Sequence, residues 1–528
     1  MLFNSPVYIF LFLPTTFVVY FLLCRRGLVI AGTAWLVCAS LFFYQYWNPA
    51  YLILILSTLL VNYALGTALC QIGRKDARQG RNRITKKTVL VFGIFFNVAL
   101  LCYFKYMDFA LATINRLFGV SFPLPHLLLP LGISFFTFQK IAFLVDCNKE
   151  RAEEYNFLHY CLFISFFPQL IAGPIVHHSE VIPQFIRLRN RVFDFRNIAK
   201  GIFLFTIGLF KKVYIADQFS VWAQQGFNSS AALSFFDAWG TSLSYTFQLY
   251  FDFSGYSDMA IGAALLFNIR LPINFDSPYK SKNIRDFWRR WHITLSRWLR
   301  DYIYIPLGGN RGGLLRGAIN IFLTFLLGGL WHGAGWTFVF WGALHGGALV
   351  MNRFWERAGL RMPGWAGWLV TFLFVNAAWV FFRAETFTGA LIILKGMAGL
   401  NGILLPSEIL SLISWPEVIR GKLMGLQGNG LLLPLKCLWY LGAFGIVALF
   451  FPNSGEISGF VPMRSLLTDG ESQKNCASWR VGLLRWLQGA LFRFQPSVYW
   501  AVLTAAMLSA ALYRLLRVAP SEFLYFNF

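Results

Sequence analysis

Long apolar runs, separated by short polar connections, recur along nearly the whole chain. An α-helix needs about 17–25 mostly apolar residues to cross the hydrocarbon core of a bilayer. Runs near this length lie at residues 6–23, 28–46, 51–72, 88–103, 127–145, 157–176, 198–215, 242–267, 319–344, 365–382, 435–451 and 498–516. This pattern predicts an all-α polytopic membrane protein with about 11–12 transmembrane helices.

The connections between these runs predict one transmembrane domain over residues 1–528. The first run is apolar from Pro6 onward and carries neither a basic segment nor a small-residue cleavage motif, so we expect a retained helix rather than a secretory signal. The longest polar connection, residues 452–493, is the expected extramembrane excursion. At 479–494 its arginines alternate with Leu, Trp and Phe, which is typical of an interfacial amphipathic helix.

Composition supports the same class of protein. Hydrophobic residues make up 57% of the chain and charged residues 13%, against roughly 45–50% and 25% in soluble domains. The formal charge of +23 does not indicate a nucleic-acid partner, because the basic residues concentrate beside the apolar runs. Residues 73–87, for example, hold seven Lys and Arg and one Asp. Such loops are typically cytoplasmic and contact membrane lipid, which places the uncharged connection WNPAY on the other side.

The eight cysteines are scattered along the chain, and none lies in a Cys-x-x-Cys pair. This spacing predicts neither a disulfide framework nor a zinc cluster. We therefore expect no bound metal and expect most cysteines to be small apolar packing residues.

The segment NIRDFWRRWHITLSRWLRDYIYIPL, residues 283–307, differs from the runs around it. It mixes eight acidic or basic residues, counting His292, with six aromatic residues. Such a segment does not cross lipid as a free-standing helix. We expect it to lie in the interface or to enter the protein as a re-entrant helix beside a cavity.

His332 lies near the middle of the apolar run 319–344. An ionisable group inside a span is costly and usually faces a bundle interior or an aqueous path, although an interhelical hydrogen bond is also a sufficient reason for it. Gly328, Gly329, Gly333 and Gly335 remove side chains around His332, which allows a helix or a substrate to approach closely. Trp331, Trp336 and Trp341 are expected to be walls of the core.

The other histidines are weaker candidates. His345 follows His332 by 13 residues, so on one regular helix it would point about 140° away. Because it lies near the predicted end of the run, we expect a packing or interfacial residue. The histidines near predicted span ends or in loops, expected to be partly solvated, are His126, His159, His177 and His178.

His292 is flanked by arginines in the sequence RRWHITLSRWLRD. Two interpretations are equally open. The segment is either a basic interfacial helix on acidic lipid headgroups or an anion site that binds phosphate.

Two carboxylates, Asp252 and Asp258, interrupt the apolar stretch 248–262. Buried carboxylates need partners. Arginines of 285–300 would make their role structural, which we favour, whereas a histidine partner would make it catalytic. Elsewhere, Pro and Gly within 129–139 and 166–177 predict broken helices of the kind that line cavities.

Five motifs in this order resemble the membrane-bound O-acyltransferase (MBOAT) superfamily. They are LPLGISFFTFQ, FFPQLIAGPI, YFDFSGYSDMAIG, FWRRWHITLSRWLRDYIYIPLGGNR and GGLWHGAGWTFVFWGALHG. The motif core spans about 129–347, and the chain looks most like the branch of the alginate O-acetyltransferase membrane subunit. Relatives in that branch acetylate peptidoglycan or cellulose, and a more distant one D-alanylates teichoic acid.

The resemblance implies membrane helices, with re-entrant or interfacial helices, around a central tunnel that an acyl donor enters from the cytoplasm. It places the family's hallmark histidine at His332 and the second polar active-site residue at His292. It also implies acetyl-CoA as donor substrate with no bound cofactor, a periplasmic acetyltransferase partner protein, and a bacterial inner membrane. Residues expected to bind substrate or donor are Arg289, Arg290, Arg297, Arg300, Asp258 and Trp331.

The function expected from this resemblance is O-acetylation of an extracytoplasmic polysaccharide such as alginate. An imidazole with a pKa of about 6.5 suits the removal of a hydroxyl proton, so His332 is the expected general base. His292 would hydrogen-bond the acceptor, the developing oxyanion or the donor, and a covalent acetyl-enzyme remains an alternative. A transporter or flippase without acyl transfer, or a scaffold of an export complex, are the other classes considered.

Overall fold

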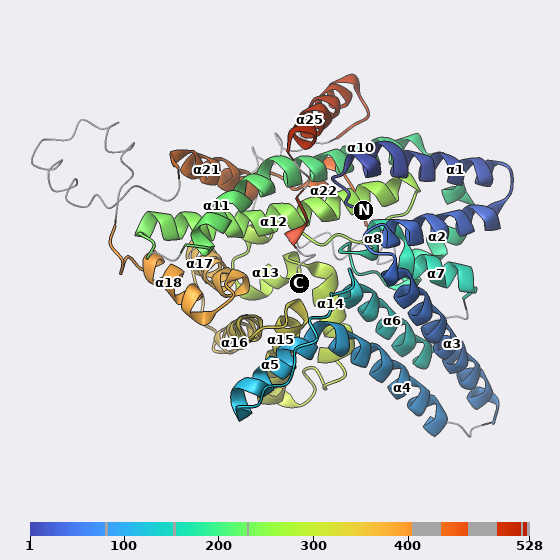
Figure 1. Cartoon of the computed structure of the whole chain (residues 1–528), viewed down its shortest axis with the longest axis horizontal. Coiled ribbons are helices and arrows are strands. Elements are labelled where there is room, and N and C mark those ends of the chain that lie inside the picture. The colour runs from blue at the N-terminus through green and yellow to red at the C-terminus, as the bar shows by residue number, and fades with distance from the viewer. Residues whose placement is uncertain are drawn as a thin grey trace, which may run out of the picture. The chain divides into compact units, whose positions relative to one another are not determined.

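The computed structural model describes residues 1–79, 83–150, 155–229, 232–403, 434–462, 494–518 and 521–524 (Figure 1). These residues form helices, and no strand occurs among them, which confirms the all-α prediction. By their internal contacts the residues fall into two compact units. Unit 1 comprises Met1–Leu209, Gly255–Asn274 and Ser454–Asn527, and unit 2 contains Phe210–Ser254 and Phe275–Asn453. The expected single domain over 1–528 stays a prediction.

Six helical stretches are long and apolar enough to cross a membrane among the residues described. They are Tyr8–Arg25, Ala50–Gly73, Thr85–Phe118, Gly313–His332, Gly364–Arg383 and Val498–Arg517. Shorter apolar helices are Val29–Gln45, Phe387–Met397 and Lys436–Phe450. A polytopic membrane protein is therefore confirmed, while the number of spans stays a prediction because several expected runs are shorter or broken helices.

Unit 1 begins with apolar helices that pack through small residues. Its elements are η1 (Tyr8–Phe12), α1 (Leu13–Arg25), α2 (Val29–Gln45), α3 (Ala50–Gln79), α4 (Arg83–Leu101), η2 (Cys102–Tyr106), α5 (Met107–Phe118), α6 (Ile133–Asn148), α7 (Phe157–Ser165), α8 (Phe167–Leu170), α9 (His178–Ile186), η3 (Leu188–Arg191), α10 (Phe195–Phe210), α22 (Ser454–Ser458) and α25 (Val498–Arg517). Helices α3, α4 and α6 lie side by side (Figure 1). Gly66 of α3 admits the ring of Phe143, and Gly93 of α4 admits Leu144, so glycine allows close helix packing.

The predicted helix breaks are confirmed in unit 1. Helix α6 starts only after Gly132, which has a φ of +71°. Helix α7 ends at Ser165, and the short α8 is followed by non-helical backbone up to His177. The Phe167 N–H donates to the Ser40 hydroxyl at 3.1 Å, which satisfies a backbone group near the break.

Unit 2 contains the segment that was expected to be re-entrant. Its elements are η4 (Lys211–Ala216), α11 (Asp217–Phe227), η5 (Pro278–Lys280), α13 (Ile284–Arg290), α14 (Ile293–Leu299), η6 (Arg300–Tyr304), α15 (Gly313–His332), α16 (Trp336–Arg357), α17 (Gly364–Arg383), α18 (Phe387–Met397), α21 (Leu435–Phe450) and the first part of α12 (Phe235–Leu266). Helices α13 and α14 have seven residues each, too few to cross a bilayer. The expected amphipathic helix at 479–494 lies outside the described residues, apart from Phe494.

The prediction of one span over 319–344 is wrong. Helix α15 ends at His332, Gly333 and Gly335 are extended on either side of a bend at Ala334, and α16 begins at Trp336. Gly329 of α15 lies against Gly342 of α16, and Phe322 lies against Gly346, so the two helices form an antiparallel hairpin. Hydropathy did not reveal this reversal because the turn Gly-Ala-Gly carries no polar side chain.

Candidate active site

His332 is the last residue of α15 rather than a mid-span residue. Its side chain is buried, and its position follows from the close contact of the two hairpin helices. A Cβ atom on Gly342 would lie 2.5 Å from the carbonyl oxygen of Phe325, so only glycine permits this approach. The glycines around His332 were expected to let either a helix or a substrate approach closely, and Gly329 serves the approach of a helix.

His292 lies in the break between α13 and α14, with a φ of +42°. This left-handed backbone conformation is uncommon for a residue with a Cβ atom, and such strain often occurs at functional sites. The His292 side chain is fully buried, and its ring contacts Phe253 with the centroids 4.8 Å apart. Burial lowers the pKa of His292 to about 3, so its imidazole is neutral near neutral pH.

The fold of unit 2 brings these two histidines together. The ring centroids of His292 and His332 are 6.4 Å apart. Trp331 contacts both, with centroid distances of 6.3 Å to His292 and 4.9 Å to His332. The two residues expected to act in catalysis are thus neighbours, although 40 residues separate them in the sequence. Their chemical roles stay predictions.

Aromatic side chains enclose His332. The rings of Trp341 and Phe382 lie 5.1 Å and 5.2 Å from it, both edge-on. Trp331 and Trp341 are buried, as expected of walls, whereas Trp336 is 54% exposed and is not part of the core. This enclosure excludes bulk water and gives hydrogen bonds a low-dielectric surrounding.

His345 lies buried among packed side chains, its role stays a prediction, and the reasoning that placed it was wrong. It belongs to α16 and not to the helix of His332, so the angle of about 140° along one helix does not apply. It is fully buried rather than interfacial. Its Nδ1 accepts a hydrogen bond of 3.2 Å from the indole N–H of Trp288.

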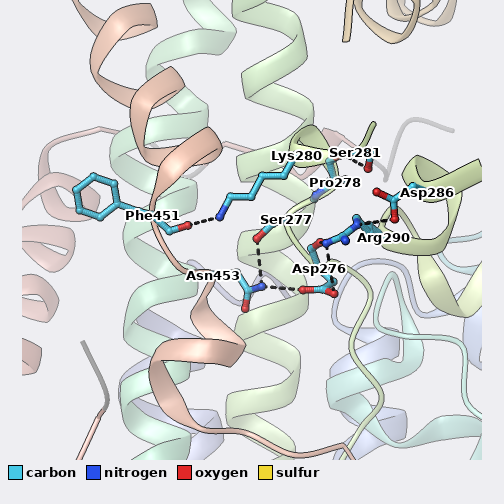
Figure 2. Close-up of polar contacts among 9 residues, drawn as sticks. All are labelled: Asp276, Ser277, Pro278, Lys280, Ser281, Asp286, Arg290, Phe451 and Asn453. Atoms are coloured by element: carbon cyan, nitrogen blue, oxygen red, sulfur yellow. Dashed lines mark hydrogen bonds and ion pairs between the residues drawn. The ribbon is translucent and has the colours of Figure 1, made fainter. Parts of the chain in front are cut away.

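The four arginines of the predicted donor site differ in their surroundings. Figure 2 shows Arg290 beside two carboxylates, with Nε 2.9 Å from Asp286 and Nη1 3.8 Å from Asp276. The Asn453 side chain also donates to Asp276, at 3.0 Å, so this network joins α13 to two other segments of unit 2 (Figure 2). Arg297 is buried, while Arg289 and Arg300 are exposed.

Asp252 and Asp258 each have a partner that the sequence reasoning did not name. Asp252 forms an ion pair of 2.6 Å with Lys212, which also pairs with Asp217 at 3.0 Å. Asp258 lies in unit 1, where it accepts a hydrogen bond of 2.8 Å from Ser454. The signal for the first pair was a lysine inside the apolar run 198–215, because a buried charge needs an opposite one.

His178 is not the partly solvated residue expected from its place near a span end. Its side chain is 2% exposed, with Nε2 3.2 Å from Asp146 and Nδ1 3.0 Å from the hydroxyl of Tyr155. The carboxylate accepts from Nε2–H, so Nδ1 accepts from the tyrosine. These three residues of unit 1 form a polar chain, with Tyr155 half-buried, that sequence reasoning missed.

No group of three or more His, Cys, Asp or Glu side chains able to hold a metal ion occurs in the parts of the chain placed by the structure. The seven cysteines that lie in the described segments form no disulfide with one another. The site around His292 and His332 is thus built from imidazoles and aromatic rings.

Comparisons with known proteins match a part of the chain that contains His292 and His332. Residues 41–387 match the family model described as MBOAT, membrane-bound O-acyltransferase family. A peptidoglycan O-acetyltransferase of Helicobacter pylori is 51% identical over 433 residues, which are 76% of this chain and 81% of the relative. A probable alginate O-acetylase AlgI of Pseudomonas aeruginosa is 39% identical over 450 residues, 84% of this chain and 81% of the relative.

A more distant relative is a teichoic acid D-alanyltransferase of Bacillus subtilis, 29% identical over 251 residues, which are 45% of this chain and 64% of the relative. The resemblance found in the five motifs is confirmed by these matches. All three names are those of acyl-transferring proteins, so they favour acyl transfer over transport without chemistry.

Proposed function

Because this chain belongs to the membrane-bound O-acyltransferase family and is an O-acyltransferase, we propose that it moves an acetyl group from a cytoplasmic donor across the membrane for O-acetylation of an extracytoplasmic polysaccharide. The observation that carries the proposal is the buried pair of His292 and His332, 6.4 Å apart. A base held in a site without bulk water speeds the attack of a hydroxyl group on a thioester and suppresses hydrolysis of the thioester.

In the proposed reaction His332 is the general base. Its neutral imidazole removes the proton of the acceptor hydroxyl while the hydroxyl oxygen bonds to the acyl carbon. The bond from that carbon to the thioester sulfur then breaks, and the thiolate takes a proton. His292 stays neutral because burial lowers its pKa to about 3, so it assists by hydrogen bonding and not as a cation.

The proposed donor is acetyl-CoA, bound as a substrate and not as a resident cofactor. Arg289 and Arg300, which are exposed, are suited to attract its phosphates, with Arg290 and Arg297 nearby in sequence. Trp331 would pack against the transferred group beside His332. Asp258 remains a proposed contributor to substrate binding.

The acceptor side of the proposal rests on the relatives. One is named for peptidoglycan and another for alginate, so both polymers are acceptors to test. We propose that the acetyl group passes to a periplasmic acetyltransferase partner protein, and that the chain resides in a bacterial inner membrane.

The test compares wild type with His332→Ala at matched membrane levels. We expect acetyl transfer from acetyl-CoA to fall by roughly 10²–10⁴-fold, the usual contribution of a general base. His126→Ala is the matched control, because the side chain of His126 is 79% exposed. The measurements are acetyl-CoA consumption and acetylation of the polymer. A His332→Ala protein that acetylates as well as the control would overturn the proposal.

A further inference from the structure

Three rings of unit 2, each carrying an N–H group, pack together on α16 and α17. The rings of Trp341 and Trp379 stack with centroids 5.5 Å apart. His345 lies 4.7 Å from Trp341 and 6.1 Å from Trp379, again between centroids. All three side chains are at most 1% exposed, so these groups form one buried cluster.

Every polar atom left over in this cluster is a donor. His345 Nδ1 accepts from Trp288, so a neutral His345 carries its proton on Nε2. The indole nitrogens of Trp341 and Trp379 only donate. Within the part of the chain that the structure describes, none of these three nitrogen atoms has a hydrogen-bond partner.

Buried polar groups in native proteins are nearly always hydrogen-bonded, because an unmade bond costs their desolvation. Three donors in one cluster therefore match a ligand group that only accepts. The surroundings favour an uncharged acceptor, because the rings of Phe374 and Phe382 line the cluster and would penalise a full charge.

The cluster borders the candidate active site. Trp341 contacts both His345 and His332, with centroid distances of 4.7 Å and 5.1 Å. Resting on the proposed function, we propose that Trp341, His345 and Trp379 donate hydrogen bonds to the acyl carbonyl oxygen of the thioester donor. This interaction holds the acyl group beside the base and polarises the carbonyl for attack.

The sharpest test removes single N–H groups and leaves an aromatic ring in place. Trp341→Phe and Trp379→Phe are the test variants. Trp239→Phe and Trp368→Phe are matched controls, because their indoles donate to the backbone carbonyls of Met397 and Tyr279 at 3.0 Å and 2.9 Å. All four variants are made in the full chain and purified in detergent.

The probes are two acetyl-CoA analogues. In one, CH₂ replaces the sulfur and the ketone keeps the carbonyl group. In the other, CH₂ also replaces the carbonyl. Wild type and the controls should bind the ketone more tightly than the alkane. In each test variant this preference should shrink by roughly 3- to 10-fold, the worth of one hydrogen bond.

Equal weakening of both analogues, or an unchanged preference for the ketone, would overturn the inference, because a packing role affects the two ligands alike. The ratio within one variant also cancels any partial loss of folded protein. If His332→Ala abolishes acetylation, but Trp341→Phe and Trp379→Phe keep the wild-type preference for the ketone, the inference alone fails. If His332→Ala acetylates normally, the proposed function fails.

Discussion

At position 292 an imidazole occupies a backbone conformation that glycine and asparagine tolerate best. The φ of +42° and the burial of a polar ring both cost free energy of folding. If His292 served packing alone, another residue would fill this position at a lower cost. The neighbouring His332, 6.4 Å away, gives a functional reason for keeping it. Asparagine accepts the same backbone conformation, so it separates the imidazole's chemistry from the local fold.

We therefore predict the properties of His292→Asn. The variant should fold and lose roughly 3- to 10-fold in acetyl transfer, because one hydrogen bond is lost and the base remains. Burial lowers the pKa of His292 to about 3, below its usual value of about 6.5. Between these values only the unfolded chain binds the proton, so the free energy of unfolding falls as the pH falls below about 6.5.

The measurement for His292→Asn is thermal unfolding in detergent at about pH 7 and pH 5. Wild type should lose more stability on acidification than the variant, which lacks the imidazole that binds the proton. Identical losses in the two proteins would contradict the pKa argument. Full acetyl transfer by the variant would instead make His292 a packing residue.

Among the helices, the α15–α16 hairpin fixes the position of His332. Its turn contains no polar side chain, and the two helices touch backbone to backbone at Gly329 and Gly342. The structure thus depends on the absence of a side chain, which a hydropathy pattern does not register. Spacing along one assumed helix consequently misplaced His345.

We predict that Gly342→Ala destabilises the protein by about 1–3 kcal/mol, because the new methyl group forces the helices apart. Acetyl transfer should also fall, since Gly329 lies three residues before His332. Gly347→Ala is the control on the same helix, where a Cβ atom meets nothing within 4 Å. Thermal unfolding and acetyl transfer are measured together, and equal behaviour of the two variants would refute the packing argument.

Local sequence signals predicted some elements and missed others for a physical reason. Pro168 and Gly132 break helices by their own backbone properties, so those breaks were predictable. The proximity of His292 and His332 followed from the resemblance and not from spacing, because tertiary packing brings α14 to the end of α15. His178 was misjudged because hydropathy cannot tell a solvated polar residue from one buried against Asp146.

Over the whole molecule, the connections between apolar runs differ in their charge. The run 73–87 is strongly basic, whereas the connection WNPAY between the second and third apolar runs carries no charge. In short loops Lys and Arg favour the cytoplasm. The proposed donor, entering from the cytoplasm, would meet such basic loops first, and the proposed acceptor polymer would lie on the other side.

We predict that Ala50 faces the periplasm and Gln79 the cytoplasm. In a cysteine-free background, Ala50→Cys should react with a membrane-impermeant maleimide on spheroplasts, because Ala50 is exposed at the end of the uncharged connection. Gln79→Cys, in the basic run 73–87, should react only after the membrane is permeabilised. Acetyl transfer by each variant checks that the fold is kept. Labelling of Gln79→Cys alone on intact spheroplasts would reverse the orientation, and the proposed cytoplasmic entry of the donor would then have to be abandoned.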